Sequence, residues 1–239
     1  MHNILDQRNL AEARLFAIVL TFCGGFIDAF TYIQCNHTLA AAQTGNIVFL
    51  SAALANHNFL GVVDRLASLI AYIIGLAIVS IFHAHIDHYW RVFCLIPILV
   101  IGMIVGGLPA SFPTYISVPA ISFGLAMQNA AFAKIEGLGY SSVFTSGNIK
   151  KSVVAWSEYY FHHDQSQRRA AIDYSMIVAG FTLGAVISAQ LQPIMKMRTI
   201  WIAVLVILIV NVTYYIQKWS HEGQNYKAKL GIFLVWLLV

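Results

Sequence analysis

The sequence predicts an all-α integral membrane protein with about six transmembrane helices in two inverted three-helix repeats, each with a short re-entrant or interrupted half-helix. The prediction rests on an apolar composition, the spacing of the apolar stretches, and a series of motifs that occurs twice. Of the 239 residues, 59% are hydrophobic and only 10% are charged. Soluble domains carry about 25% charged residues, so the excess apolar surface must face lipid. Five prolines and no polar linker favour a single membrane domain over residues 1–239.

Six stretches are long and apolar enough to cross a bilayer, which takes about 20 mostly apolar residues. In chain order they are Leu15–Gln34, Val62–His83, Val92–Leu108, Thr114–Ala133, Tyr174–Leu191 and Thr199–Ile216. Two further apolar pieces, Leu39–Ala55 and Val143–Trp156, are interrupted by polar residues and are predicted to be half-helices. The final Leu230–Val239 is too short to cross. We expect it to lie at the interface or against the bundle, within a cytoplasmic or interfacial C-terminal segment, 218–239.

The basic residues predict that both termini are cytoplasmic. With six spans and the N-terminus inside, eleven basic residues fall in cytoplasmic segments and three in outer segments, in line with the preference of Lys and Arg for the inner side. The inner set is Arg8, Arg14, Arg91, Lys134, Lys150, Lys151, Arg168, Arg169, Lys218, Lys227 and Lys229, and the outer set is Arg65, Lys196 and Arg198. Membrane topology therefore accounts for the basic balance, and no nucleic-acid partner is expected.

Two halves of the chain, about 15–110 and 114–217, carry similar motifs in the same order. The first half has Gly25-Phe-Ile-Asp28-Ala29, Thr44-Gly45-Asn46 and Ala71-Tyr-Ile-Ile-Gly75, and the second has Ala126-Met-Gln128-Asn129-Ala130, Thr145-Ser146-Gly147-Asn148 and Gly180-Phe-Thr-Leu-Gly184. Three crossings per copy would invert the second copy relative to the first; chance similarity among apolar segments is the alternative. Inverted repeats with interrupted helices in matching positions are typical of secondary transporters, whose binding sites they mark.

At these residues the chain resembles the YoaK family of uncharacterised bacterial multi-pass membrane proteins. The resemblance rests on Gly25–Ala29, on Thr44-Gly45-Asn46 before an apolar run, and on Met127–Ala130. The later Thr145–Asn148 matches the second Thr-Gly signature of that family with one inserted residue. The resemblance covers about residues 13–218. It implies a bacterial inner (cytoplasmic) membrane protein of about six spans, and it implies no particular substrate.

Asp28 is the sharpest candidate functional residue, because it lies inside the first predicted span. An ionised carboxylate there is costly, and intramembrane acids usually face a cavity or a partner. Asp28 either binds a coupling proton or cation, or is a buried carboxyl bonded to backbone that is freed where a nearby helix breaks. Its counterpart Asn129, beside Gln128, offers the same polar contacts without a charge, so a role that depends on charge would be asymmetric between the halves.

The two Thr-Gly elements are the other candidates: Thr44, Gly45 and Asn46, then Thr145, Ser146, Gly147 and Asn148. Thr or Asn can cap the free amides of a helix start, and glycine permits close approach. Free N–H groups and the helix dipole favour an anion or a polar solute at such a start. Plain capping of a structural turn is the alternative.

Other motifs give weaker signals. Gly102-xxx-Gly106 and Gly180-xxx-Gly184 allow close helix packing, either within the bundle or in a homodimer. His83, His85 and His88 do not share one helix face, and Cys23, Cys35 and Cys94 form no CxxC pair, so neither a metal site nor a cofactor is predicted. We find no GxSxG, HExxH or Walker A motif, which argues against an enzyme.

The sequence therefore favours a secondary transporter or channel-like protein for a small polar or anionic solute, coupled to a proton or a cation and embedded in the lipid bilayer. The motif residues from Asp28 to Asn148 would line its site near the bilayer midplane. One alternative is a non-transporting scaffold or assembly subunit whose half-helices fill the bundle. The other is an intramembrane enzyme acting on a lipid, for which only Lys150–Asp173 is polar enough to supply a site.

Overall fold

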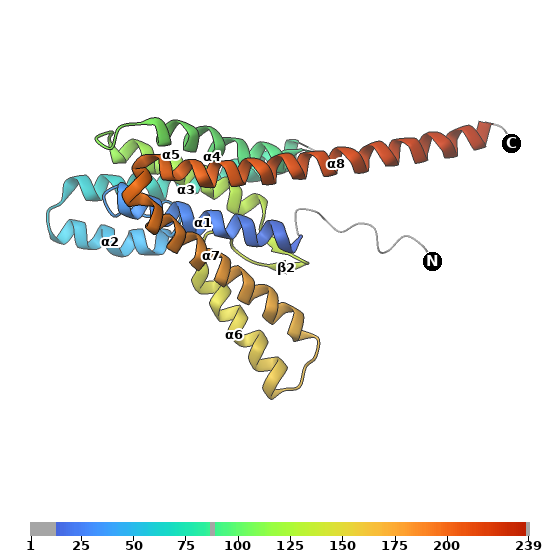
Figure 1. Ribbon diagram of the computed structural model, residues 1–239, viewed down its shortest axis with the longest axis horizontal. Coiled ribbons are helices and arrows are strands. Elements are labelled where there is room, and N and C mark those ends of the chain that lie inside the picture. Colours follow the sequence, from blue (N-terminus) through green and yellow to red (C-terminus); the bar gives the residue numbers. More distant parts are fainter. Residues whose placement is uncertain (1–12, 87–88, 238–239) are drawn as a thin grey trace.

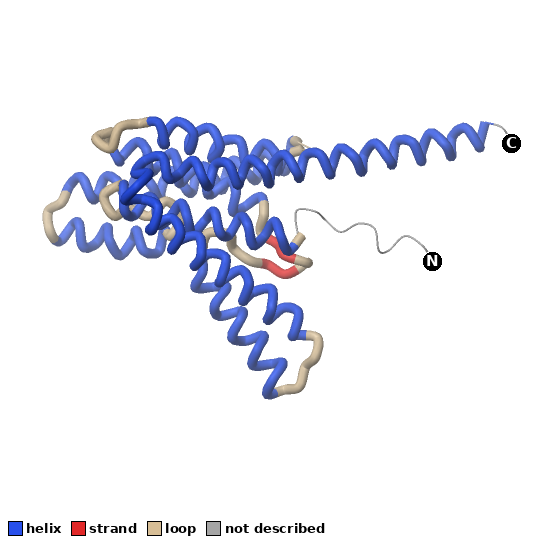
Figure 2. Tube along the Cα trace, in the orientation of Figure 1, coloured by secondary structure: helices blue, strands red, loops and turns tan. Residues whose placement is uncertain are grey.

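The computed structural model describes residues 13–86 and 89–237, with side chains through Ser220. Helices make up most of this part of the chain (Figures 1 and 2). They are α1 (Arg14–Gln34), α2 (Gln43–Ala55), α3 (Phe59–His85), α4 (Trp90–Gly107), α5 (Thr114–Ala131), α6 (Thr145–Phe161), α7 (Gln167–Met195), the 3₁₀ turn η2 (Lys196–Thr199) and α8 (Ile200–Leu237). Arg8 and His88 lie outside the described residues.

The core of the bundle forms around α1 and α5, on which more than half of the residues are buried. Helix α1 packs against α7 and α8, and α5 packs against α3 and α4, while α4 also meets α8. The half-helix α2 lies on α3, and α6 lies on α7. Fully buried aromatic and aliphatic side chains fill the space between these helices, among them Phe26, Phe30, Leu125, Ile98 and Ile207.

Taken in chain order, the long helices α1, α3, α4, α5, α7 and α8 run in alternating directions, as Figure 1 shows. Helices that are neighbours in space can therefore be parallel. Contacts from Arg14–Asp173 to Ala29–Gln192 place α1 parallel to α7. Contacts of α5 with α3, from Thr114–Asp64 to Asn129–Tyr72, make these two helices parallel as well. Helix α2 lies along the bundle and ends at the turn before α3, whereas α6 points obliquely away from the bundle together with the first part of α7 (Figure 1).

In the described part of the chain, four helical stretches are long and apolar enough to cross a membrane by length and composition. They are Arg14–Gln34, Phe59–His85, Trp90–Gly107 and Gln167–Ser220, the last of which contains both α7 and the first part of α8. Helix α5 forms at the predicted fourth span but is not in this set. It carries Ser117, Ser122, Gln128 and Asn129, and because most of its surface is buried by other helices it needs fewer lipid-compatible side chains.

Local sequence explains several boundaries of these elements. The side chain of Asn58 accepts a 3.0 Å hydrogen bond from the Gly61 amide and so caps the start of α3. Pro109 and Pro113 lie in the turn that separates α4 from α5. After α5, β1 (Lys134–Ile135) and β2 (Leu138–Gly139) form a two-residue hairpin whose turn, Glu136-Gly137, has positive φ at both positions, as a tight hairpin turn requires.

Two helices are longer than the hydrophobicity pattern predicts. Helix α7 begins at Gln167, seven residues before the expected Tyr174, and α8 continues to Leu237 instead of ending near Ile216. No proline stops α8 between Ile216 and Leu237, so the helix continues to Leu237 and projects beyond the bundle (Figure 1). This segment therefore does not pack against the bundle, which was one of the two expected positions.

Both Gly-xxx-Gly motifs are used within the chain. A side chain at Gly184 or Gly180 would meet the backbone oxygen of Phe22 or Ile18 on α1, and one at Gly102 would meet Val204 on α8. The homodimer suggested for these faces is therefore not supported, because helices of the same chain cover them.

Candidate functional site

Asp28 lies where the chain enters the first half-helix. Its carboxylate accepts hydrogen bonds from the backbone amides of Ala41 at 2.7 Å and Ala42 at 3.2 Å, just before α2 begins. The preceding amide, of Ala40, donates to the Thr31 hydroxyl at 3.1 Å. Asp28 is only 4% exposed. One buried acid on α1 thus satisfies the amides that a helix start leaves unpaired.

Asn46, on the first turn of α2, closes the same segment from the other side. Its side-chain oxygen accepts from the Leu39 amide at 3.0 Å and its amide donates to the Leu39 oxygen at 2.6 Å. That amide also lies 3.0 Å from Gln43 Oε1 and 3.4 Å from the Ser68 hydroxyl. The loop before α2 is therefore held between a side chain of α1 and one of α2.

The second half-helix is held in the same way. Asn129 Oδ1 accepts from the Ser142 amide at 3.0 Å and from the Ser141 hydroxyl at 2.9 Å. Asn148 accepts from the Ser141 amide at 3.3 Å and donates to the Ser141 oxygen at 2.7 Å. In both halves the bonds join residues 13 and 7 positions apart in the chain. Asn129 thus does with a neutral amide what Asp28 does with a carboxylate.

Tyr72 on α3 lies between the two half-helix starts. Its hydroxyl accepts a 3.2 Å hydrogen bond from Asn129, and its ring lies 5.9 Å from that of Phe144, which precedes α6. On the same helix, the Ser68 and Ser122 hydroxyls join α3 to α5 at 2.6 Å, and Ser68 also accepts from Asn46 at 3.4 Å. Polar side chains of α3 therefore contact both clusters in the buried interior.

The remaining candidates divide into two groups. Thr44, Ser146 and Gly147 are exposed on the half-helix surfaces, and Gly45 is half-buried against Leu39. Gln128 Oε1 and Thr145 Oγ1 are instead buried with no hydrogen-bond partner among the described residues. An unpaired buried polar atom costs about 1–3 kcal/mol, so these two oxygens are places where a polar ligand or water would be stabilised.

Two buried acids form part of this arrangement and were not predicted. Asp64 on α3 accepts from the Thr114 hydroxyl at 2.9 Å, at the first residue of α5, and from Asn36 at 2.7 Å. Asp173 on α7 forms an ion pair with Arg14, at the first residue of α1. Both acids are 0% exposed. Each lies 11 residues before a close-packed glycine, Gly75 or Gly184, and the motif alignment would have revealed this spacing.

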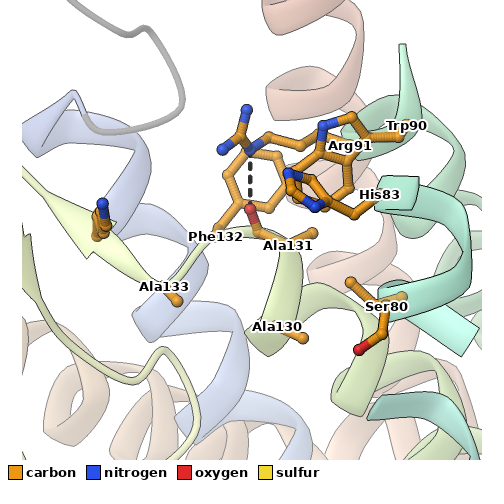
Figure 3. A pocket seen from close by; sticks show the side chains of 10 residues that line it. Ser80, His83, Trp90, Arg91, Ala130, Ala131, Phe132 and Ala133 are labelled. Atoms are coloured by element: carbon orange, nitrogen blue, oxygen red, sulfur yellow. Dashed lines mark hydrogen bonds between the residues drawn. The ribbon is translucent and has the colours of Figure 1, made fainter. Parts of the chain in front are cut away.

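Three cavities lined by described residues open at the ends of helices. None of them is lined by a candidate site residue, that is, by Asp28, Thr44, Gly45, Asn46, Gln128, Asn129, Thr145, Ser146, Gly147 or Asn148. The cavity in Figure 3, of about 460 Å³, lies where α3 and α5 end and α4 begins. A second, of about 740 Å³, lies between the ends of α4 and α7, and a third, of about 340 Å³, between the ends of α1 and α7.

Long apolar helices around a core that buries polar side chains define a multi-pass, all-α membrane protein. The chain belongs to the family described as Protein of unknown function (DUF1275), whose model matches residues 16–213. It is also 24% identical, over 204 residues, to the UPF0700 transmembrane protein YoaK of Bacillus subtilis (strain 168), a match that covers 82% of this chain and 91% of that protein. No solved structure matches. The resemblance to the YoaK family is therefore confirmed.

Proposed function

We propose that this chain is a six-span secondary transporter of the bacterial inner membrane, built from two inverted repeats with both termini cytoplasmic. Its cargo is a small polar or anionic solute. The matched side-chain hydrogen bonds that hold the loops before α2 and α6 carry the proposal. Interrupted helices in equivalent positions of two inverted halves are typical of secondary transporters and mark their sites.

Helix packing supports the repeat independently of these hydrogen bonds. A Cβ at Gly184 would lie 2.0 Å from the Phe22 oxygen, and one at Gly75 would lie 2.6 Å from the Phe123 oxygen. Phe22 and Phe123 are 101 positions apart, as are Asp28 and Asn129. The contact of α7 with α1 is therefore repeated by the contact of α3 with α5, which is expected if one unit occurs twice.

In the proposed mechanism the solute binds between the starts of α2 and α6, near the bilayer midplane. Thr44, Gly45 and Asn46 face it from one half, and Thr145, Ser146, Gly147 and Asn148 from the other. The unpaired oxygens of Gln128 and Thr145 add polar contacts. Asp28 binds the coupling proton or cation. Since a proton on Asp28 weakens its bonds to the amides of Ala41 and Ala42, coupling acts directly on the position of α2.

Transport by purified protein in proteoliposomes tests the proposal. We expect at least one solute from a panel of small polar and anionic compounds to enter faster than into empty liposomes, and an imposed proton or cation gradient to accelerate it. Asp28→Asn should remove the effect of the gradient. Asn129 holds the second loop through a single amide oxygen, so Asp28→Asn can keep the bond from Ala41. The new NH2 group cannot accept from the Ala42 amide, so the thermal midpoint should fall, but by less than if both bonds were lost.

Asp164→Asn, in the loop between α6 and α7, is the matched control, because it removes one acidic charge far from both half-helix starts. It should leave uptake and its gradient dependence intact. Asp28→Leu should instead destabilise the fold, since it leaves two buried amides without an acceptor, at about 1–3 kcal/mol each. A panel without uptake would count against transport, and gradient-driven uptake that survives in Asp28→Asn would remove the coupling role.

The scaffold function remains the second candidate, because one observation favours it. Both acceptor side chains, Asp28 and Asn129, are already bonded to their own backbone, and the three described cavities are not lined by the motif residues. A scaffold predicts that Asp28→Asn and Asn46→Ala affect stability alone. A transporter predicts the same stability effects, so the uptake assay separates the two functions.

The proposed topology gives a prediction of its own. Ala110→Cys, in the turn between α4 and α5, should react with a membrane-impermeant maleimide in intact cells, and Gln165→Cys, between α6 and α7, should react only after lysis. The three native cysteines are buried, so background labelling should be low. Labelling of both positions in intact cells would contradict the six-span arrangement.

A further inference from the structure

We propose that the cavity at the junction of α3, α4 and α5 binds a phosphate group, either from a lipid headgroup or as a free anion. This cavity has a volume of about 460 Å³ and is lined by Val79, Ser80, His83, Trp90, Arg91, Ala130, Ala131, Phe132, Ala133 and Lys134. It contains none of the residues proposed to carry transport, so the inference does not depend on that function.

Basic side chains reach this cavity from three separate elements. His83 comes from the last turn of α3, Arg91 from the first turn of α4, and Lys134 from β1. None of the described lining residues is acidic. Three cationic or protonatable groups around one open space favour a ligand that carries negative charge.

Arg91 is held in a position from which it can bind an anion. Its Nε donates a 3.0 Å hydrogen bond to the Ala131 oxygen, drawn in Figure 3, and its guanidinium lies 4.4 Å from the centre of the Trp90 ring. Those contacts fix the plane of the group. The two terminal nitrogens bond to no group in the described part of the chain, and paired N–H groups of this kind match phosphate oxygens.

The other basic groups complete the environment. The His83 ring packs edge-on against Trp90 at 4.8 Å, so the imidazole is positioned at the same side of the cavity (Figure 3). The Lys134 side chain has no hydrogen bond or ion pair among the described residues. The first amides of α4, which begins at Trp90, add positive potential at this side of the cavity. Trp90 is an aromatic residue at a helix end, a position typical of headgroup level.

Binding to defined probes tests the site. Purified protein in an uncharged, phosphate-free maltoside detergent would be titrated with phosphatidylglycerol and, in a separate arm, with inorganic phosphate. We expect at least one probe to bind, and its Kd to rise roughly tenfold in Lys134→Gln and further in Arg91→Gln/Lys134→Gln, since a hydrogen bond to a charged group is worth about one such factor. Binding of lipid alone identifies a headgroup, and competition by phosphate identifies a free anion.

Lys150→Gln is the matched control, because Lys150 is exposed, has no bonded side-chain partner among the described residues, and lies on α6 away from the cavity. Its Kd should stay at the wild-type value. The Lys134 side chain makes no hydrogen bond or ion pair with the described residues, and Lys134→Gln leaves the backbone pairing with Gly139 in place. This variant therefore keeps the test valid even if Arg91→Gln lowers stability through the lost bond to Ala131. Unchanged binding in the double variant, an equal loss in Lys150→Gln, or no binding of either probe would overturn the site.

Discussion

Gly184→Ala is expected to lower the free energy of unfolding by about 3 kcal/mol or more, the upper part of the range for overpacked cores. A Cβ at this position would lie 2.0 Å from the carbonyl oxygen of Phe22 and 2.8 Å from its carbon. Both atoms belong to the backbone of α1 and cannot rotate away as a side-chain end would. The substitution must therefore push α7 away from α1 at the place where the two helices pack together.

Glycines at graded distances supply the controls for this prediction. A Cβ at Gly180, on the same face of α7, would lie 3.1 Å from the Ile18 oxygen, and one at Gly107 would lie 3.9 Å from Trp201. We expect Gly180→Ala to cost less than Gly184→Ala, and Gly107→Ala to be close to neutral. Unfolding in mixed detergent micelles measures all three. Equal stability of the Gly184→Ala and Gly107→Ala variants would contradict the close contact of α1 and α7.

The hydrophobic pattern predicted where the helices lie, and it predicted the ends of those helices that contain few residues beyond their apolar stretch. Helix α1 begins at Arg14 against a predicted Leu15, and α4 ends at Gly107 against Leu108. Helices α7 and α8 instead extend beyond the apolar residues. An apolar stretch indicates which residues are buried in lipid or in the protein core. A helix, by contrast, continues through polar residues until a turn, a glycine or a proline ends it.

Paired motifs predicted which residues would mark the half-helices, and Asp28 and Asn129 lie at those two starts. Periodicity could not predict that their side chains bond to backbone amides 13 residues further along the chain. The sequence did not mark Asp64 and Asp173 as buried, because each lies within the first two turns of its helix, where a charged side chain can reach water or headgroups. Only packing shows that both acids are fully buried and that each meets the first residue of α5 or α1.

Arg14→Gln is expected to destabilise the protein by about 3–5 kcal/mol, the usual cost of leaving a buried charge without its partner. Asp173 is 0% exposed, and its two carboxylate oxygens accept no hydrogen bond from the described residues, so Arg14 is its charge partner. Without the guanidinium, Asp173 must remain as an isolated buried anion or take up a proton. The ion pair joins the beginning of α1 to α7, so the loss should weaken the same helix contact that Gly184 permits.

The two partners of this pair should respond unequally, because the Arg14 side chain is 38% exposed. In Asp173→Asn the freed guanidinium can turn toward water or headgroups, so the cost should be smaller than in Arg14→Gln. The double variant should be more stable than Arg14→Gln alone, since it removes the uncompensated carboxylate. Arg169→Gln is the matched control, because the Arg169–Glu136 pair is a surface contact, with Arg169 62% exposed, and such pairs contribute about 0–1 kcal/mol. Equal, small losses of unfolding free energy in Arg14→Gln and Arg169→Gln would contradict the burial of the Asp173 carboxylate.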